Sequence, residues 1–337
     1  MAETGSALIF TGQGYVEPGM GLVMKETLVG KEMLEEVDAR LPGSGIVDLL
    51  LTGTKNELVQ TDKAQLATYI RSAYDLRVTH PSAFHPYGDS YIATDAMKAI
   101  ADFGLGHSLG EFTAMHGTGA LTFSDGLLAV DYRGRKMQEL IKVGAQNGVR
   151  TVMTAVTGLR EGAAPIAEIC HDITSRRSDH EEVFDYVSVA NYNGPMQTVI
   201  GGTVEAVEEA EEAIRAQYRP RRIDRLDLPA AFHTRFFDSA INSIRRFMLN
   251  GVTLYTPVIP LVHNLNAEPN LEPQEIAARS SLQVANPVLF TGSIGYMGEN
   301  GLRRVEIFGP GSENVGKMVK ATLKGIEIVP VDSQPSQ

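Results

Sequence analysis

The most constraining feature of this chain is the segment Gly106-His107-Ser108-Leu109-Gly110, in which two glycines flank a serine at the spacing G-x-S-x-G. This spacing is typical of a nucleophilic serine on a sharp turn between a strand and a helix, because glycine on both sides leaves room for the helix to start against the strand. Apolar residues precede the motif over 99–105, and helix-compatible sequence follows it over 112–117. The motif therefore predicts an exposed serine hydroxyl, with the backbone N–H of Leu109 at a helix N-terminus where it can face an oxyanion.

A second turn that follows a strand lies at the start of the chain. The apolar run 7–10 leads into Thr11-Gly12-Gln13-Gly14. Open α/β folds bind ligands at the carboxyl ends of their strands, so we expect the amide groups of Gln13 there. A phosphate-binding loop is the rival interpretation, but neither G-K-[ST] nor G-x-G-x-x-G is present. The chain has 33 glycines and can contain G-x-S-x-G by chance as an ordinary turn; the second motif favours an enzyme.

Together, segments 10–14 and 106–111 resemble the malonyl-CoA:acyl carrier protein transacylase family. The resemblance extends over essentially the whole chain, through segments 61–65, 131–138, 190–197, 231–234, 286–288 and 309–311. It implies an α/β fold with a hydrolase-like large domain built on a parallel sheet. It also implies an acyltransferase activity that uses a serine nucleophile.

Hydrophobic periodicity gives the domain organisation. Apolar residues recur at helical spacing over 123–143, so Arg133 lies on a long helix behind the serine turn. The next elements are a strand at 151–156, a helix at 161–175, strands at 186–190 and 198–200, a helix at 204–217 and a strand at 222–228. This β-α-β-β-α-β order is ferredoxin-like. We expect an inserted small domain at 149–229, with an exposed loop at 176–182, and a large α/β catalytic domain formed by 1–148 and 230–337.

A serine hydroxyl needs a base within hydrogen-bond reach, so the chain must supply a histidine. His233 is the best candidate, because it lies where the small domain returns to the large one and its segment resembles the catalytic histidine motif of the family. The resemblance also implies that the backbone carbonyl of Gln283 orients this imidazole in place of an acidic side chain. A carbonyl can fix the tautomer in that way. The oxyanion is expected to bind the backbone N–H groups of Gln13 and Leu109.

Arg133 matches the arginine motif of the family and indicates which acyl group is bound. A guanidinium can hold a carboxylate through two parallel hydrogen bonds, which suits the free end of a malonyl group. The alternative is a surface ion pair with Asp131 or Glu139 on the same helix.

Two further positions bear on the shape of the acyl site. The resemblance associates Phe232, directly before the histidine, with malonyl, because its ring would crowd a methyl group on the acyl α-carbon. Asn191 and Asn193 could line the small-domain side of the cleft, or they could be turn residues before Pro195.

The expected reaction is a ping-pong exchange. A malonyl group passes from malonyl-CoA to a malonyl-serine ester, and then to the phosphopantetheine thiol of acyl carrier protein, supplying extender units for fatty acid synthesis. A discrete malonyltransferase of a polyketide synthase would use the same residues. An acyl-thioester hydrolase and a noncatalytic docking subunit are further alternatives. Both thioesters are substrates, and no cofactor is expected.

Composition excludes several classes of protein. A net charge of −11 argues against a nonspecific nucleic-acid binder. No apolar run is long enough to cross a bilayer and no signal peptide is apparent, so the sequence predicts a cytoplasmic protein, or one of an organelle matrix if a targeting segment was removed. The single cysteine, Cys170, cannot form an internal disulfide. No C-x-x-C or H-E-x-x-H is present, so no metal is expected. The resemblance implies a monomer.

Although the net charge of the chain is negative, two clusters of basic residues are present, at 215–225 and at 303–324. Either could steer an acidic acyl carrier protein or the phosphates of coenzyme A, or each could be no more than a solvated face. The segment 79–95 is the least typical of the family. It is expected to remodel one wall of the entrance or to lengthen a loop.

Overall fold

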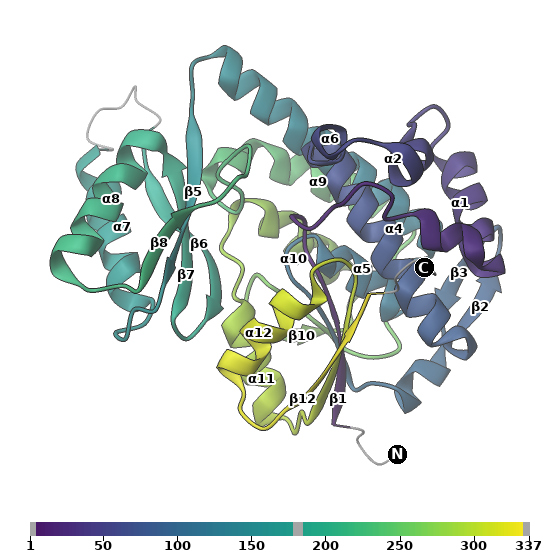
Figure 1. Ribbon diagram of the computed structural model, residues 1–337. Helices are drawn as coiled ribbons and strands as arrows, with labels where there is room; N and C mark the ends of the chain where they lie inside the picture. The colour runs from purple at the N-terminus through teal and green to yellow at the C-terminus, as the bar shows by residue number, and fades with distance from the viewer. Residues whose placement is uncertain (1–4, 178–184, 333–337) are drawn as a thin grey trace.

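The computed structural model describes residues 5–177 and 185–332 and shows two units, each with its own sheet (Figure 1). The large sheet has the order β10-β9-β4-β1-β11-β12 and is parallel except for the β9–β10 pair. Its strands are β1 Ser6–Phe10, β4 Phe103–Gly106, β9 Leu261–Val262, β10 Pro269–Asn270, β11 Arg304–Phe308 and β12 Glu327–Val331. The predicted α/β class with a mainly parallel sheet is confirmed.

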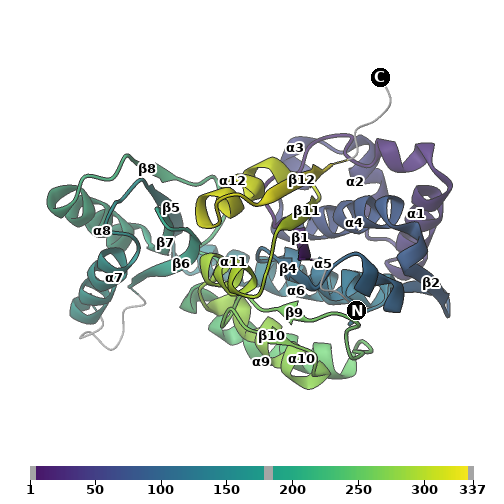
Figure 2. The ribbon, with the colours of Figure 1, turned by 90° about the horizontal axis from the view of Figure 1, so that it is seen from below.

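Central strand β1 explains how the large sheet is buried on both faces. Its side chains alternate between two apolar clusters, with Leu8 and Phe10 in one and Ala7 and Ile9 in the other. The first face is covered by α4 Thr61–Thr79 and α5 Gly110–Gly117, and the second by α11 Phe290–Glu299 and α12 Ser312–Thr322 (Figure 2). The carboxyl ends of β1 and β4, where the two glycine motifs lie, are therefore held in a rigid, buried sheet.

The remaining helices of the large unit surround this core. They are α1 Leu28–Arg40, α2 Ile46–Thr52, α3 Lys55–Leu58, α6 Phe123–Gln146, α9 Asp238–Asn250 and α10 Pro273–Leu282, with short 3₁₀ turns η1 Leu22–Glu26, η2 Pro81–Ala83, η3 Asp95–Ala99, η4 Arg235–Phe237 and η5 Gln283–Ala285. The long helix predicted at 123–143 is confirmed as α6. It begins after Thr122, whose side chain accepts a hydrogen bond from the backbone N–H of Asp125.

The small unit has the predicted β-α-β-β-α-β order. Its elements are β5 Thr151–Thr157, α7 Ala164–Arg177, β6 Val187–Gly194, β7 Gln197–Thr203, α8 Val204–Gln217 and β8 Arg222–Arg225. The antiparallel sheet has the order β6-β7-β5-β8, and α7 and α8 pack against it. All of these elements lie within 149–229, and the domain limits themselves stay predictions.

Several element bounds in the small unit differ from the sequence prediction; for example, β6 runs on to Gly194 rather than ending at 190, and α7 begins at Ala164 rather than at 161. The last strand ends at Arg225 rather than at 228: the Leu226 N–H still donates to the Met153 carbonyl of β5, but the Leu228 N–H donates to the Leu226 carbonyl in a local turn. Arg176 and Arg177, expected in a loop, belong to helix α7, where both pair with Glu209 of α8. The rest of the predicted loop, 178–182, lies outside the described residues.

The segment 79–95 forms a hairpin of β2 Phe84–Tyr87 and β3 Ser90–Ala93. The hairpin lies at the edge of the large unit, on the side away from the small unit (Figure 1). It is fixed there by the ring of Phe84, which stacks on His116 of α5 at a centroid distance of 5.2 Å.

The glycines of the serine motif are required by close backbone packing. A Cβ atom on Gly106 would overlap the backbone of Gly110, and one on Gly110 would overlap the carbonyl oxygen of Phe10 in β1. Helix α5 can thus start directly against β1 and β4 because neither glycine carries a side chain.

We predict that Gly110→Ala lowers the free energy of unfolding by about 2 kcal/mol or more, since the rigid backbone of β1 must shift to admit the methyl group. Gly295→Ala is the matched control. Gly295 lies inside helix α11 with open space around its Cα, so alanine should leave stability unchanged or raise it by up to about 1 kcal/mol. Urea unfolding measures both, and equal effects would contradict the packing argument.

Candidate active site

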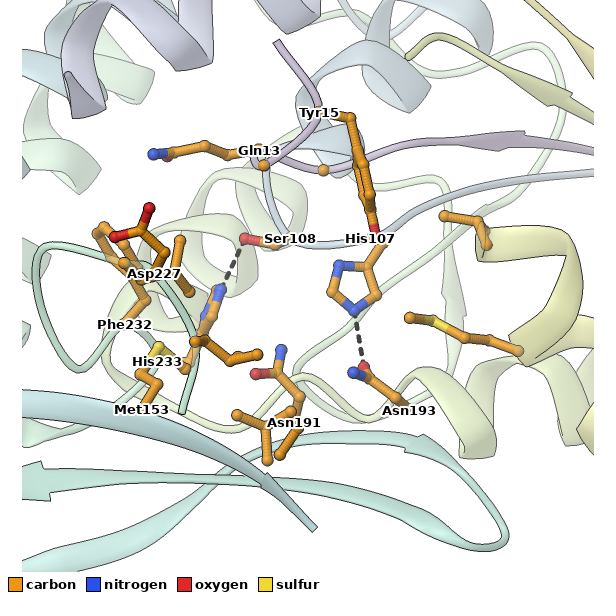
Figure 3. Close-up of a pocket in the computed structure, with 18 of the residues that line it drawn as sticks. Gln13, Tyr15, His107, Ser108, Met153, Asn191, Asn193, Asp227, Phe232 and His233 are labelled. Atoms are coloured by element: carbon orange, nitrogen blue, oxygen red, sulfur yellow. Dashed lines mark hydrogen bonds between the residues drawn. The ribbon is translucent and has the colours of Figure 1, made fainter. Parts of the chain in front are cut away.

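Ser108 occupies a strained turn between β4 and α5. Its φ is 54°, in the left-handed region that residues with a side chain rarely adopt. Asn264 holds this conformation, since its side-chain oxygen accepts a hydrogen bond from the Ser108 N–H at 2.7 Å and its amide donates to the Gly106 carbonyl at 2.6 Å. The hydroxyl is thereby turned away from the backbone of the sheet and into a cavity (Figure 3).

The structure brings Ser108, His233 and Gln283 together as the sequence predicts. Ser108 Oγ lies 2.6 Å from His233 Nε2, and His233 Nδ1 lies 2.8 Å from the backbone carbonyl of Gln283. A carbonyl can only accept, so Nδ1 carries the proton and Nε2 is free to accept one from the serine. His233 also has a positive φ, of 61°. The catalytic roles of these residues remain our proposal.

The environment of His233 keeps its ring neutral. The side chain is buried, and burial lowers its pKa to about 3, helped by the positive charge of Arg133. The hydrogen bond with the Gln283 carbonyl opposes this shift without reversing it. At neutral pH the imidazole is therefore in the form that can act as a base.

The backbone around Gln13 and Leu109 has the form expected of an oxyanion site. Gly12 approaches the serine turn so closely that a Cβ atom on it would lie 2.6 Å from the His107 carbonyl oxygen. Among the described residues, no hydrogen bond engages the N–H of Gln13 or of Leu109. Both donors are thus available for a ligand, and their assignment to the oxyanion stays a prediction.

A cavity of about 380 Å³ opens above Ser108 between the two units (Figure 3). Asn191 and Asn193 line it from strand β6, so the alternative that they are turn residues before Pro195 is wrong. Asn193 also binds the serine turn, since its side-chain oxygen lies 2.8 Å from His107 Nε2. Phe232 lines the cavity with its ring stacked on Phe237 at a centroid distance of 5.5 Å. The small unit therefore supplies one wall of the site.

Arg133 reaches the same cavity from helix α6 and is only 1% exposed. Its guanidinium donates to the side-chain oxygens of Gln65, at 2.6 Å, and Gln283, at 3.2 Å, while its Nε has no hydrogen-bond partner. Burial lowers its pKa to about 10, and the negative charge of Glu111 opposes the shift, so it remains a cation at neutral pH.

The alternative surface ion pair for Arg133 is wrong. Asp131 pairs instead with Arg135, and Glu139 pairs with Lys136 at 2.7 Å. These four side chains are more exposed than Arg133, which is buried and lines the cavity. No carboxylate among the described residues lies within ion-pair distance of Arg133.

A buried polar network beneath the serine turn escaped the sequence analysis. Glu111 accepts hydrogen bonds from the Asn264 N–H at 2.8 Å and from the Gln283 side-chain amide at 3.1 Å, and lies 3.0 Å from His263 Nδ1. The same Gln283 amide donates to the Ser108 carbonyl at 2.9 Å. Gln283 was expected to act through its backbone alone. Only the position of Glu111, directly after the G-x-S-x-G motif, signalled this network.

None of residues 79–95 lines the cavity, so the expectation that this segment remodels the entrance is wrong; its hairpin packs on α5 instead. Within 5–177 and 185–332, no cluster of His, Cys, Asp and Glu side chains is arranged to hold a metal ion. None of the helices in those ranges combines the length and apolarity needed to cross a membrane.

Comparisons with known proteins agree on one family. The family model for the acyl transferase domain matches residues 7–302. The chain is 29% identical over 325 residues to the malonyl CoA-acyl carrier protein transacylase of Bacillus subtilis, covering 96% of this chain and 92% of that protein. It is 28% identical over 326 residues to a polyketide biosynthesis malonyl CoA-acyl carrier protein transacylase of the same organism, covering 96% and 98%. The crystal structure of an acyl-carrier-protein S-malonyltransferase from Bartonella henselae superposes with a TM-score of 0.82 at 27% identity, covering 98% and 96%.

The pKa of His233 leads to a prediction about reactivity. The rate at which a fluorophosphonate labels Ser108 should change little between about pH 7.5 and about pH 5.5, because a base with a pKa of about 3 stays neutral over this range. A histidine with the ordinary pKa of about 6.5 would lose about tenfold. Intact-mass kinetics measures the rate. A midpoint near pH 6.5 would show that the buried environment does not control this base.

Proposed function

This chain belongs to the malonyl-CoA:acyl carrier protein transacylase family of acyltransferases, and we propose that it transfers a malonyl group from malonyl-CoA to an acyl carrier protein. The observation that carries this proposal is the state of Arg133. A buried guanidinium that is bonded only to neutral amides, with one N–H unpaired, faces the cavity that contains Ser108. Such a group favours an acyl chain that ends in a carboxylate.

A plain acyl chain in the same cavity would leave the cation uncompensated. Burying an unpaired charge is costly, and each hydrogen bond from a guanidinium to a carboxylate is stronger than one to an amide. Malonyl places its carboxylate on the far side of the thioester carbonyl, so Ser108 and Arg133 can engage its two ends at once. This arrangement fixes the reacting carbonyl for attack.

In the first half-reaction Ser108 Oγ attacks the thioester carbonyl while His233 Nε2 takes the hydroxyl proton. The oxyanion is stabilised by the N–H groups of Gln13 and Leu109. When the carbon–sulfur bond breaks, His233 returns the proton to the sulfur, and free coenzyme A leaves a malonyl ester on Ser108. The phosphopantetheine thiol of the carrier protein then gives its proton to His233 and attacks the ester, and the released serine oxygen recovers that proton.

Phe232 limits the acyl groups that fit. Its ring is fixed by the stack on Phe237 and lines the cavity next to His233, so it cannot move aside easily. A methyl group on the acyl α-carbon would meet this ring, which supports malonyl rather than a branched group.

The pathway supplied with malonyl units is a separate question. Fatty acid synthesis is our first proposal. Service to a polyketide synthase is the second candidate, supported by the similarity to the polyketide transacylase of Bacillus subtilis. Both use the same active-site residues, so the carrier protein that accepts the malonyl group distinguishes them. A hydrolase of plain acyl thioesters is less well supported, because a plain acyl chain would leave the buried Arg133 cation in the acyl cavity without a partner.

Brief exposure to malonyl-CoA should add one malonyl group to the protein, as measured by intact mass. The adduct should be absent from Ser108→Ala and should disappear when a phosphopantetheinylated carrier protein is added, with malonyl appearing on that protein. Acetyl-CoA serves as the matched substrate control. Rapid release of acetate or malonate to water, with no transfer to a carrier, would instead favour the hydrolase.

Arg133→Gln should reduce the rate of malonyl transfer about a hundredfold or more, because the two charge-assisted hydrogen bonds to the carboxylate are lost. The rate with acetyl-CoA should fall far less, so selectivity for malonyl declines. Arg135→Gln is the matched control, since Arg135 lies on the same helix with an exposed side chain paired to Asp131. An equal loss for malonyl and acetyl in Arg133→Gln would contradict a role in recognising the carboxylate.

A further inference from the structure

A second cavity, of about 690 Å³, adjoins the active site at the junction of the two units. It shares four lining residues with the active-site cavity, namely Tyr15, Asn193, Gln197 and Met318, so the two spaces are adjacent. Cationic side chains that do not reach the active-site cavity line this second cavity, and no Asp or Glu of the described residues lines it. These cations are Arg160, Arg219, Arg221 and Lys317. We call this second cavity the basic groove.

The arginines of the basic groove differ from the other arginines of the small unit. Arg176 and Arg177 pair with Glu209, and Arg225 pairs with Glu208, so these side chains are neutralised by the protein itself. By contrast, no carboxylate of the described residues lies within ion-pair distance of Arg160, Arg219 or Arg221. Lys317 donates only to the side-chain oxygen of Asn314, at 3.1 Å.

Ion pairing distinguishes the members of the two basic clusters, because some of their cations have a carboxylate partner within the protein and others do not. Arg215 pairs with Glu211, Arg222 with Asp224, and Arg304 with both Glu306 and Glu327. Of the cluster cations without an ion pair among the described residues, Arg219, Arg221 and Lys317 line the basic groove together with Arg160, whereas Arg303, Lys320 and Lys324 do not, in a chain whose net charge is −11. A concave site lined by one sign of charge attracts a ligand of the opposite sign.

We propose that the basic groove binds the phosphate of the phosphopantetheine arm that carries the thioester, an inference that rests on the proposed function. Guanidinium groups bind phosphate through paired, charge-assisted hydrogen bonds. Tyr15, Asn193 and Gln197 line both the groove and the cavity that contains Ser108, and their side chains offer hydroxyl and amide groups to the amide groups of the pantetheine chain. The ring of Tyr15 fits there because Gly311 leaves room for it.

The test compares two malonyl thioesters on the triple variant Arg160→Ser, Arg219→Ser, Arg221→Ser. Malonyl-CoA contains the phosphates, and malonyl-N-acetylcysteamine has the same reacting end without them. The KM for malonyl-CoA should rise about tenfold or more, while kcat/KM for the short thioester stays within about twofold of the wild type. Arg222→Ser is the matched control, because Arg222 is adjacent in sequence, paired with Asp224, and outside the lining of the groove.

Competition experiments identify which phosphate is bound. Coenzyme A contains both the arm phosphate and those of its nucleotide, whereas the carrier protein presents only the former. 4′-Phosphopantetheine should inhibit the wild type more strongly than pantetheine, and the triple variant should lose this difference. Inhibition by adenosine 3′,5′-bisphosphate alone, with none by 4′-phosphopantetheine, would assign the groove to the nucleotide and overturn the proposal.

Two further results would overturn it. One is an unchanged KM for malonyl-CoA in the triple variant, and the other is an equal loss with both thioesters, which would indicate a structural defect. Calorimetric binding of free coenzyme A tests the groove without any acyl transfer. If no malonyl-serine forms even in the wild type, the proposed function fails, yet tighter binding of coenzyme A to the wild type than to the triple variant would still support the groove.

Discussion

The hydrogen bond between Ser108 Oγ and His233 Nε2 depends on two residues that are both held at positive φ. Neither is glycine, so each conformation costs free energy that the surroundings must offset. Asn264 stabilises the turn at Ser108 through hydrogen bonds with the Ser108 N–H and the Gly106 carbonyl. The ring of His233 is held by its hydrogen bond to the Gln283 carbonyl. The 2.6 Å contact joins segments 125 residues apart, and a third segment, which contains Asn264 and Gln283, makes hydrogen bonds to both.

The buried carboxylate of Glu111 contributes to holding Ser108 and His233 in these conformations. Its carboxylate has no exposure to solvent and is satisfied by the Asn264 N–H and the Gln283 amide. Asn264 and Gln283 are also the residues that position Ser108 and His233. The Glu111 carboxylate therefore holds these two positioning residues and does not contact the reacting groups. Gln283 also contacts Arg133 through its side-chain oxygen. Gln283 thus links the serine turn and the cation through its side chain and the base through its backbone carbonyl, so one residue connects all three parts of the site.

Local features could be predicted from the residues themselves, whereas long-range contacts could be predicted only where the family resemblance supplied them, as for His233 and the Gln283 carbonyl. The turn at Ser108 follows from a motif of five consecutive residues, and the order of elements in the small unit follows from hydrophobic periodicity. The partners of Glu111 lie more than 150 residues away along the chain, and nothing in the periodicity couples them. The hairpin at 79–95 was misplaced for the same reason, since the contact of Phe84 with His116 that fixes it depends on tertiary packing.

Electrostatics connects acyl recognition to the base. The charge of Arg133 is one of the causes that hold the pKa of His233 near 3, because a second positive charge nearby disfavours the imidazolium. A carboxylate bound to Arg133 offsets that charge, so the pKa of His233 rises when a malonyl group is in place. A higher pKa makes Nε2 a better proton acceptor for Ser108. An acyl group without a carboxylate brings no such compensation, and it therefore meets a weaker base as well as an unpaired cation. On the proposed function, Arg133 contributes to selectivity through reactivity in addition to binding.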